Sequence, residues 1–348
     1  MLSSAHDTPD IVTAPRALPG IGHVLPLVRD PLGFLSSLPA HGDLVRLRLG
    51  ATEVVLVCDP GLAWDVLRND RVFDKEGPTY EVARQALRNG IATCPHRDHR
   101  RHRRLCQPAF HPDRFPGYEE IMSRHIGDVV TTWKAGQILH VPAEIRKITS
   151  RSAIDTMFHS AVPSPTADLI THDVVTLLKG LYWRSVMPPL FCRMPTPGNR
   201  RFFQARDHLR RVVENVINER RAEGKDRGDL LSALLAVYLG GEEDDLEIRD
   251  HIMTFFVGGT ESSSVTLSWA LYFLARHPRI RARLQEEVDA VVGDNLTAVT
   301  SHLPYLDLTQ RVLTETMRIY PPGWLFSRVV TADTRLGRVV KVLVIATR

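Results

Sequence analysis

A long apolar segment with polar residues at its centre constrains the fold of this chain more than any other feature. It runs from His251 to Arg276 and has the 3.6-residue periodicity of a helix. A helix of about 26 residues spans roughly 39 Å, which is enough to cross a whole domain. Two adjacent glycines, Gly258 and Gly259, lie near its middle and cost about 1 kcal/mol each relative to alanine. A flat ligand lying close to the backbone would offset that cost.

Two polar side chains follow these glycines. Glu261 supplies a carboxylate and Ser262 a hydroxyl, which together provide a proton donor and a site for ordered water beside a ligand. The alternative interpretation is a helix packed closely on another helix through its glycines, with Glu261 facing solvent. Short glycine motifs are weak signals, so the segment alone leaves both interpretations open.

The rest of the chain predicts a mainly α fold with a small β portion. Prolines and glycines from Pro15 to Pro26 predict an extended meander, and Asp43–Leu49 with Glu53–Cys58 predict a β hairpin. Strand-like sequence returns at Ser327–Thr331 and Val339–Ile345. Helical periodicity marks the segments between them, namely Leu62–Arg68, Ile121–Trp133, Ile145–Met157, Leu209–Arg221, Leu230–Tyr238, His251–Arg276 and Arg281–Val291.

Composition argues against several classes of protein. Apolar residues make up 43% of the chain and charged residues 24%, as in folded globular proteins. The four cysteines show neither CxxC spacing nor a secretory framework, so we expect free thiols and a cytoplasmic location. The N-terminal residues lack the basic region and apolar stretch of a signal peptide. Gly258, Gly259 and Glu261 interrupt the one long apolar segment, so no membrane span is expected.

A second motif lies near the end of the chain. Glu315 and Arg318 are three residues apart on a predicted helix that ends at Pro321 and Pro322. This spacing lets the two side chains pair on one face, where we expect them to hold a buried network. An isolated pair of this kind is usually a surface salt bridge that contributes little to stability.

The order and spacing of the motifs resemble the cytochrome P450 family of haem-thiolate monooxygenases. The family has a long G-G-x-E-S-S-like helix followed by E-x-x-R before Pro-Pro. Three further segments agree, and the resemblance extends to about Leu336. They are LPGIGHVLPLVRDPLGF near the start, HRDHRRHRRLCQPAF at His96–Phe110 and GDLLSALL at Gly228–Leu235.

The resemblance implies roles for individual residues. Glu261 and Ser262 match the acid and alcohol that relay protons to iron-bound dioxygen, although most members have Thr at the position of Ser262. His99 and Arg103 match the family's H-x-x-x-R helix and, with Arg328, the residues that bind haem propionates. Arginine suits such carboxylates because its contacts are charge-assisted. Gly258 and Gly259 would let the haem approach the helix, and Glu315 with Arg318 would be a structural pair.

The resemblance also implies the partners. Members insert one atom of dioxygen into an apolar small molecule, using haem iron and two electrons from a redox partner. The style of the sequence is similar to bacterial oxygenases of terpenoid and other natural-product pathways. No flavin or ferredoxin module is fused to the chain, so we expect a separate ferredoxin or similar electron donor. We expect a monomer, with no membrane partner.

The helix at His96–Phe110 has a competing interpretation. Its dense arginines are typical of a nucleic-acid-binding protein. However, no aromatic residues that could stack on bases are interleaved with them, and Asp98 interrupts the run. A role in holding propionates accounts for His99 and Arg103 and leaves the other arginines to face an acidic electron donor. We therefore expect no nucleic-acid partner.

One family motif has no counterpart in this sequence. Members carry a glycine-rich loop after E-x-x-R whose cysteine is the axial haem ligand, but no cysteine follows Arg318 here. No residue is therefore assigned as a metal ligand. The tail after Gly337 has no proline, glycine or turn signal, which suggests a frameshift or premature stop. We expect a cytochrome P450-like fold lacking its C-terminal haem-ligand region, and no activity in the chain as it stands.

These observations predict one truncated domain over residues 1–348. Residues 1–60 would form the proline-rich meander and β hairpin, 61–326 the helical portion and 327–348 a β-like tail. A haem-dependent monooxygenase by family is the first functional interpretation. A haem-free remnant or binding scaffold is the second, and a nucleic-acid binder the third.

Overall fold

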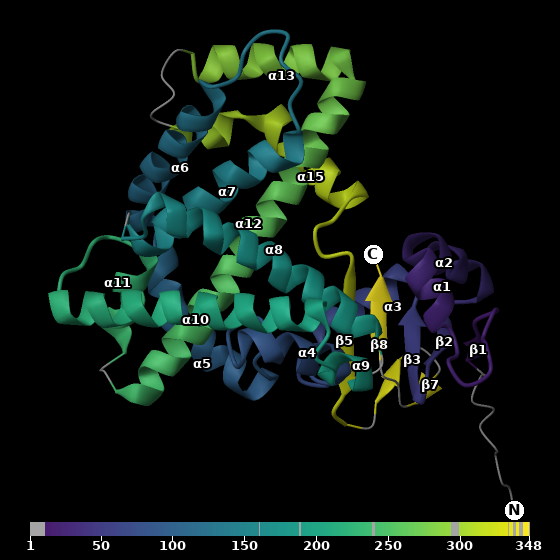
Figure 1. The fold of residues 1–348 in the computed structure, drawn as a ribbon. Helices are drawn as coiled ribbons and strands as arrows, with labels where there is room; N and C mark the ends of the chain where they lie inside the picture. The colour runs from purple at the N-terminus through teal and green to yellow at the C-terminus, as the bar shows by residue number, and fades with distance from the viewer. Residues whose placement is uncertain are drawn as a thin grey trace, which may run out of the picture.

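Helices make up most of the computed structural model, and a small sheet lies at one end of it (Figure 1). The structure describes residues 11–159, 161–187, 189–238, 241–293, 299–332, 334–336, 339–340 and 344–347. This arrangement confirms the predicted mainly α fold with a small β portion.

The helices include every periodic segment identified in the sequence, and others. Their bounds are α1 (Val24–Arg29), α2 (Pro31–Ser37), α3 (Pro60–Arg68), α4 (Pro78–Leu87), α5 (His96–Cys106), α6 (Phe115–Val130), α7 (Val141–Phe158), α8 (Ser164–Val186), α9 (Pro189–Arg193), α10 (Pro197–Glu223), α11 (Leu230–Val237), α12 (Glu242–Arg276), α13 (Pro278–Val291), α14 (Val299–His302) and α15 (Asp307–Ile319). Short 3₁₀ turns occupy Leu38–His41, Gln107–Phe110, Pro112–Arg114 and Leu303–Tyr305.

Helix α12 runs through the middle of the helical portion (Figure 1). It begins at Glu242 rather than at the predicted His251. The added turns are rich in Asp and Glu, which stabilise the positive end of a helix dipole. The predicted apolar period misses these turns because their residues are polar.

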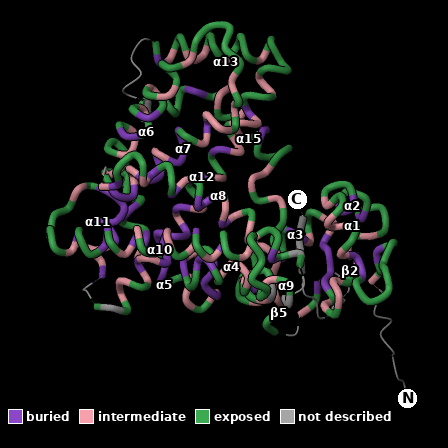
Figure 2. The backbone as a smooth tube through the Cα atoms, viewed as in Figure 1, coloured by how far each residue is buried: buried purple, intermediate pink, exposed green. Residues whose placement is uncertain are grey.

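Helix α7 packs along α12 and forms the centre of the main core. The rings of Phe158 and Phe256 meet edge to face, with centroids 5.5 Å apart, and both side chains are fully buried. Such a pair contributes about 0.5–1.5 kcal/mol beyond its buried area. Nearby, the hydroxyl of buried Thr149 donates to the backbone carbonyl of Thr260 at 3.1 Å. Figure 2 shows buried residues along α7, α10 and α12, whereas α13 has no buried residue.

The sheet joins segments from both ends of the sequence. Its strands are β1 (Val12–Thr13), β2 (Leu44–Leu49), β3 (Thr52–Val57), β4 (Phe73–Asp74), β5 (Leu325–Val330) and β8 (Val344–Thr347), in the order β1-β2-β3-β8-β5-β4. The predicted hairpin is confirmed as the antiparallel pair β2–β3. Strand β8 lies parallel to β3 and antiparallel to β5. A separate ribbon pairs β6 (Arg335–Leu336) with β7 (Val339–Val340).

The expected N-terminal meander is wrong in part. Val24–Arg29 and Pro31–Ser37 are helices rather than extended chain. Pro31 occupies the first position of α2, where its fixed φ angle favours a helix and its missing N–H is not needed. The Asp30 carboxylate caps this helix by accepting from the N–H of Gly33 at 2.9 Å. The sequence interpretation took the prolines of this segment as a sign of extended structure, but Pro31 begins a helix.

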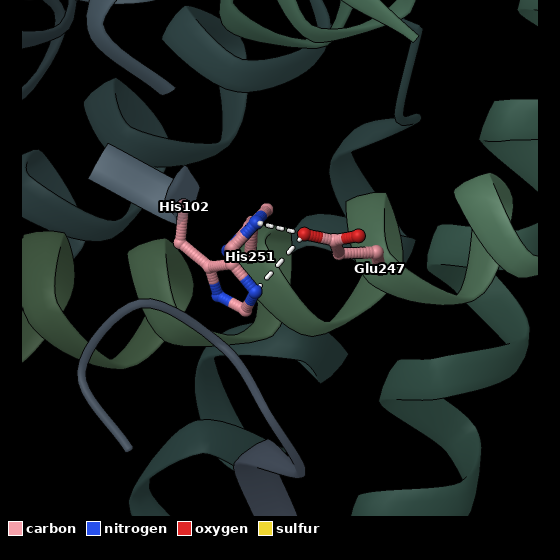
Figure 3. A group of neighbouring side chains, drawn as sticks. All are labelled: His102, Glu247 and His251. Atoms are coloured by element: carbon pink, nitrogen blue, oxygen red, sulfur yellow. Dashed lines mark ion pairs between the residues drawn. The ribbon is translucent and has the colours of Figure 1, made fainter. Parts of the chain in front are cut away.

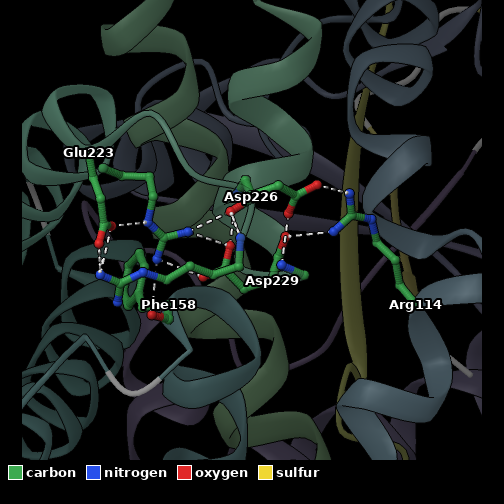
Figure 4. A network of polar contacts seen from close by, with 9 residues as sticks. Arg114, Phe158, Glu223, Asp226 and Asp229 are labelled. Carbon is green, nitrogen blue, oxygen red and sulfur yellow. Dashed lines mark hydrogen bonds and ion pairs between the residues drawn. The ribbon is translucent and has the colours of Figure 1, made fainter.

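A buried ion pair connects three helix ends (Figure 4). Arg220, near the end of α10, contacts both carboxylate oxygens of Asp229 at 2.8 Å. Its guanidinium also donates to the Phe158 carbonyl at the end of α7, at 3.2 Å. Asp229 caps α11 by accepting from the N–H of Ser232 at 2.8 Å. Arg220 and Asp229 are 3% and 1% exposed, so contacts within the protein, rather than water, compensate their charges. Arg220 Nε also lies 3.8 Å from the Glu223 carboxylate, and its Nη1 donates to the Ser232 hydroxyl.

Candidate active site on helix α12

The predicted ligand face of α12 is exposed at the centre of an otherwise buried helix. Gly258, Gly259 and Ser262 are exposed, whereas Phe256 and Thr260 beside them are buried. A Cβ atom added to Gly258 would meet no described atom within 4 Å. One added to Gly259 would lie at an ordinary contact distance of 3.5 Å from Ala153. No described helix therefore requires these glycines for close packing, which favours the ligand interpretation over the helix-packing alternative.

We expect Gly258→Ala to raise the free energy of unfolding by about 0.5–1 kcal/mol, because alanine removes backbone freedom from the unfolded chain without a clash. The measurement is urea unfolding of the protein without haem. Gly90→Ala is the contrasting control, since its Cβ would lie 2.2 Å from Thr254 Oγ1 and 2.4 Å from the Asp250 carbonyl. A loss of stability in Gly258→Ala would show that this face is covered by the chain itself.

Glu261 lies beside a cation that the sequence interpretation missed. Its Oε2 is 3.6 Å from Nε of Arg146 on α7, which is too long for a hydrogen bond. Both atoms are buried and have no hydrogen-bond partner among the described residues. Ser262 Oγ donates to the Gly258 carbonyl at 2.5 Å, one turn back along α12. The acid and alcohol therefore sit together next to the exposed glycines, and one carboxylate oxygen retains its capacity to accept a proton or hydrogen bond.

Two of the three predicted propionate ligands, His99 and Arg328, lie near a further cation, Lys75, and the third, Arg103, lies near His99. Burial lowers the pKa of His99, and the positive charges of Lys75 and Arg103 lower it further. Burial likewise lowers the pKa of Lys75, and the charge of Arg328 adds to this effect. Arg328 Nη1 donates to the hydroxyl of Tyr80 at 2.9 Å. Among the described residues, neither Arg103 nor Arg328 forms an ion pair with a carboxylate.

This cluster of His99, Arg103, Arg328 and Lys75 fits a ligand that carries carboxylates. Its positive charges come from α5, from β5 and from the loop before α4, so distant segments converge on one place. Asp70 and Asp74 offset part of this charge, since both raise the pKa of Lys75, and an anion that joins the cluster would offset more of it. The two propionates of a haem would supply that anion. No local pattern marks Lys75, because its place in the cluster depends on chain topology.

Glu315 and Arg318 form the expected pair, but not a buried one. Arg318 Nε and Nη2 both contact the Glu315 carboxylate at 2.7 Å. The side chains are 57% and 69% exposed, so the prediction of a buried network is wrong for the described structure. Helix α15 packs on α12. Tyr320, the residue after α15, stacks on Trp269 of α12 with ring centroids 4.0 Å apart. The charged pair lies outside that contact, and no described element covers it.

The cysteines do not match the thiolate that the family resemblance implies. Burial raises the pKa of Cys106 to about 12 and that of Cys58 to about 11. It also raises the pKa of Cys94, whose sulfur donates to the Ile91 carbonyl at 3.4 Å. Cys192 lies on the short helix α9 rather than in a glycine-rich loop. All four are free, and the raised pKa values of Cys58, Cys94 and Cys106 disfavour the thiolate that binds metals.

A cavity of about 1140 Å³ lies between the N-terminal β segments, α4 and the ends of α8 and α10. Apolar side chains such as Val24, Leu27 and Val82 line part of it, and arginines including Arg184 and Arg210 line another part. Ser327 reaches its wall next to Arg328. The cavity therefore adjoins the cation cluster and does not include Glu261. None of the helices that the structure describes combines the length and apolar character needed to cross a membrane.

Comparison with known proteins agrees with this geometry. The family model for cytochrome P450 matches residues 13–341. Pentalenene oxygenase of Streptomyces avermitilis is 41% identical over 329 residues, which cover 94% of this chain and 73% of that protein. Cyclooctat-9-en-7-ol 5-monooxygenase of Streptomyces melanosporofaciens is 39% identical, with 93% and 71% covered. Cyclooctatin synthase of the same organism is 41% identical, with 93% and 72% covered. By family this chain is a haem-dependent monooxygenase, and it belongs to the cytochrome P450 family.

Proposed function

We propose that this chain supplies two sets of residues to an oxygenase that acts on an apolar terpenoid. One set handles dioxygen and its protons, and the other binds the haem propionates. Three relatives that are 39–41% identical are named as an oxygenase of pentalenene, a cyclooctat-9-en-7-ol monooxygenase and a cyclooctatin synthase, which supports this substrate class. The observation that carries the proposal is the exposed Gly258–Gly259 face at the centre of a buried helix, with Glu261 and Ser262 beside it.

The side chains suit two tasks at such a site. Haem, when bound, supplies the iron at which dioxygen is activated. Arg103, Arg328 and His99 would hold its carboxylates, since arginine binds carboxylates by charge-assisted hydrogen bonds. Glu261 would pass protons through the hydroxyl of Ser262, which is both donor and acceptor. Arg146 would keep the Glu261 carboxylate oriented, because its guanidinium lies 3.6 Å away.

The electron donor is proposed to be a small acidic protein of the ferredoxin type. Arg97, Arg100 and Arg104 are exposed on α5, the helix that also carries His99 and Arg103. Such a positive surface favours encounter with a negative partner and weakens with added salt. We further propose a monomer in a reducing, cytoplasmic environment, which the four free thiols support.

Haem uptake tests the proposal directly. The purified chain is titrated with haemin and followed by its absorption, and the reduced carbon monoxide complex is then recorded. We expect binding that depends on Arg103, without a thiolate-type spectrum, because burial keeps Cys94 and Cys106 as thiols. Failure to bind haemin would support a haem-free scaffold instead. A thiolate-type spectrum would show that one of the described cysteines reaches the iron.

A further inference from the structure

Two buried histidines and a half-buried glutamate meet between α5 and α12 (Figure 3), on the part of α12 that precedes its two glycines. His102 comes from α5, and Glu247 and His251 lie one turn apart on α12. His102 Nε2 is 3.1 Å from Glu247 Oε1, and His251 Nε2 is 3.7 Å from the same oxygen. All three candidate ligand atoms lie within 4.8 Å of one another.

These separations match the dimensions of a small metal site. Zinc binds histidine nitrogen and carboxylate oxygen at about 2.0–2.2 Å, usually in a tetrahedron, which places neighbouring ligand atoms about 3.4 Å apart. The distances of 3.1 and 3.7 Å to Glu247 Oε1 bracket this value. The two histidine nitrogens lie within 4.8 Å of each other, so side-chain adjustments would bring all three atoms to an ion placed between them.

Three of the four ring nitrogens in these histidines have no hydrogen-bond partner among the described residues. His251 is fully buried, and neither of its ring nitrogens has a hydrogen-bond partner among the described residues. His102 is 2% exposed, and its Nδ1 is also without one. Buried polar atoms almost always have a hydrogen-bond partner, so unpartnered nitrogens at this depth indicate that a further group binds here. Nε2 of His251 faces Glu247 and His102 (Figure 3). A cation bound between the three side chains would therefore accept the lone pair of this nitrogen.

The charge states of the three side chains suit a metal. Burial and the neighbouring His251 lower the pKa of His102, which favours the neutral ring that binds metals. Burial alone would raise the pKa of Glu247, but contacts with His251 and Arg101 outweigh it and bring the value to about 2. Arg101 Nη2 contacts Glu247 Oε2 at 3.0 Å and its Nη1 contacts Oε1 at 2.5 Å. The Arg101 side chain is 58% exposed, so it can keep Oε2 and yield Oε1.

We propose that His102, Glu247 and His251 bind one zinc ion that connects α5 to α12. Two imidazoles and one carboxylate are a donor set that zinc accepts readily, and water would complete the tetrahedron. The ion would join the helix that carries His99 and Arg103 to the helix that carries Glu261. The i,i+4 spacing of Glu247 and His251 is the sequence signal for half of this site, and the pairing with His102 depends on the fold.

Zinc binding by the full, untagged chain tests the proposal. The protein is stripped with a chelator, titrated with zinc chloride by calorimetry, and analysed for zinc after gel filtration. We expect one ion per chain. Loss of a residue that merely supports a ligand costs about 10–100-fold in affinity, so His251→Gln and Glu247→Gln should each lose about 100-fold or more. His125→Gln is the matched control, because His125 is also buried and contacts a carboxylate, Asp155, at 2.7 Å.

Equal zinc affinity in the wild type, His251→Gln and Glu247→Gln would overturn the proposal, as would zinc-free protein after gel filtration. Circular dichroism without metal shows whether each variant is folded. If the variants do not fold, cobalt(II) replaces zinc in the wild-type protein. Tetrahedral cobalt absorption bands are expected, and their absence would mean that the cluster is only a hydrogen-bonded network.

Discussion

Asp229→Ala is expected to lower the free energy of unfolding by about 3–5 kcal/mol, the usual cost of leaving one partner of a buried ion pair alone. The change leaves the Arg220 guanidinium, which is 3% exposed, with the more distant carboxylate of Glu223, 3.8 Å from its Nε, in place of the two 2.8 Å contacts to Asp229. It also removes the cap of α11, where Asp229 Oδ1 accepts from the N–H of Ser232. Both losses act at the junction of α7, α10 and α11. Urea unfolding of the wild type and the variant, monitored by circular dichroism, measures the difference in their free energies of unfolding.

Two further variants separate the causes. Asp229→Asn keeps an oxygen that can cap α11, so it should recover the cap but not the charge. Replacing Arg220 and Asp229 together with apolar residues should cost less than Asp229→Ala, because no buried charge remains alone. Asp168→Ala is the surface control, since Asp168 is 68% exposed in its contact with Arg151. It should cost less than about 1 kcal/mol. Equal losses in Asp229→Ala and Asp168→Ala would contradict the buried-pair argument.

Arg103→Ala and Arg328→Ala are each expected to weaken haemin binding by about tenfold to 100-fold. A hydrogen bond to a charged group contributes about 1.5–3 kcal/mol, and each 1.4 kcal/mol corresponds to a factor of ten. Arg328 lies near Lys75 and Arg103 lies near His99, and neither arginine forms an ion pair with a carboxylate among the described residues. An absorption titration of each variant with haemin measures the effect.

The control for this experiment lies on the same helix. Arg100→Ala removes an exposed arginine of α5 and should leave haemin affinity within about twofold, since exposed charges are strongly screened. Arg103→Ala should also leave stability nearly unchanged, because Arg103 is exposed. Arg328→Ala also removes the hydrogen bond from Arg328 to Tyr80, so its effect on haemin binding is harder to separate from a change in local structure. An equal loss of affinity in all three variants would indicate non-specific attraction of haemin to a positive surface.

Local patterns and motifs predicted many of the helices, but α4, α8, α9 and α14 were missed, as were α1 and α2 near the N-terminus. The period of α12, the β2–β3 hairpin and the motif residues were recognisable because their spacing reflects the repeat of one element. Helix α8 was not predicted. It packs against α4, α7, α10 and α12, so its apolar residues do not lie on one narrow face. The helices α1 and α2 were missed because proline begins a helix as well as ending one.

The sequence by itself determined the family and the long central helix, and it predicted Glu261, Ser262, His99, Arg103 and Arg328 as site residues. Only the tertiary structure decided which cations and acids meet them. Arg146 beside Glu261, Lys75 among the propionate residues and His102 beside Glu247 and His251 all depend on contacts between distant segments. It also placed Glu315 and Arg318 at the surface. The physical reason is that sequence periodicity reflects contacts within one or two turns of a single helix. Pairs of residues far apart in the sequence depend on how the helices pack and on which charged side chains are buried next to each other.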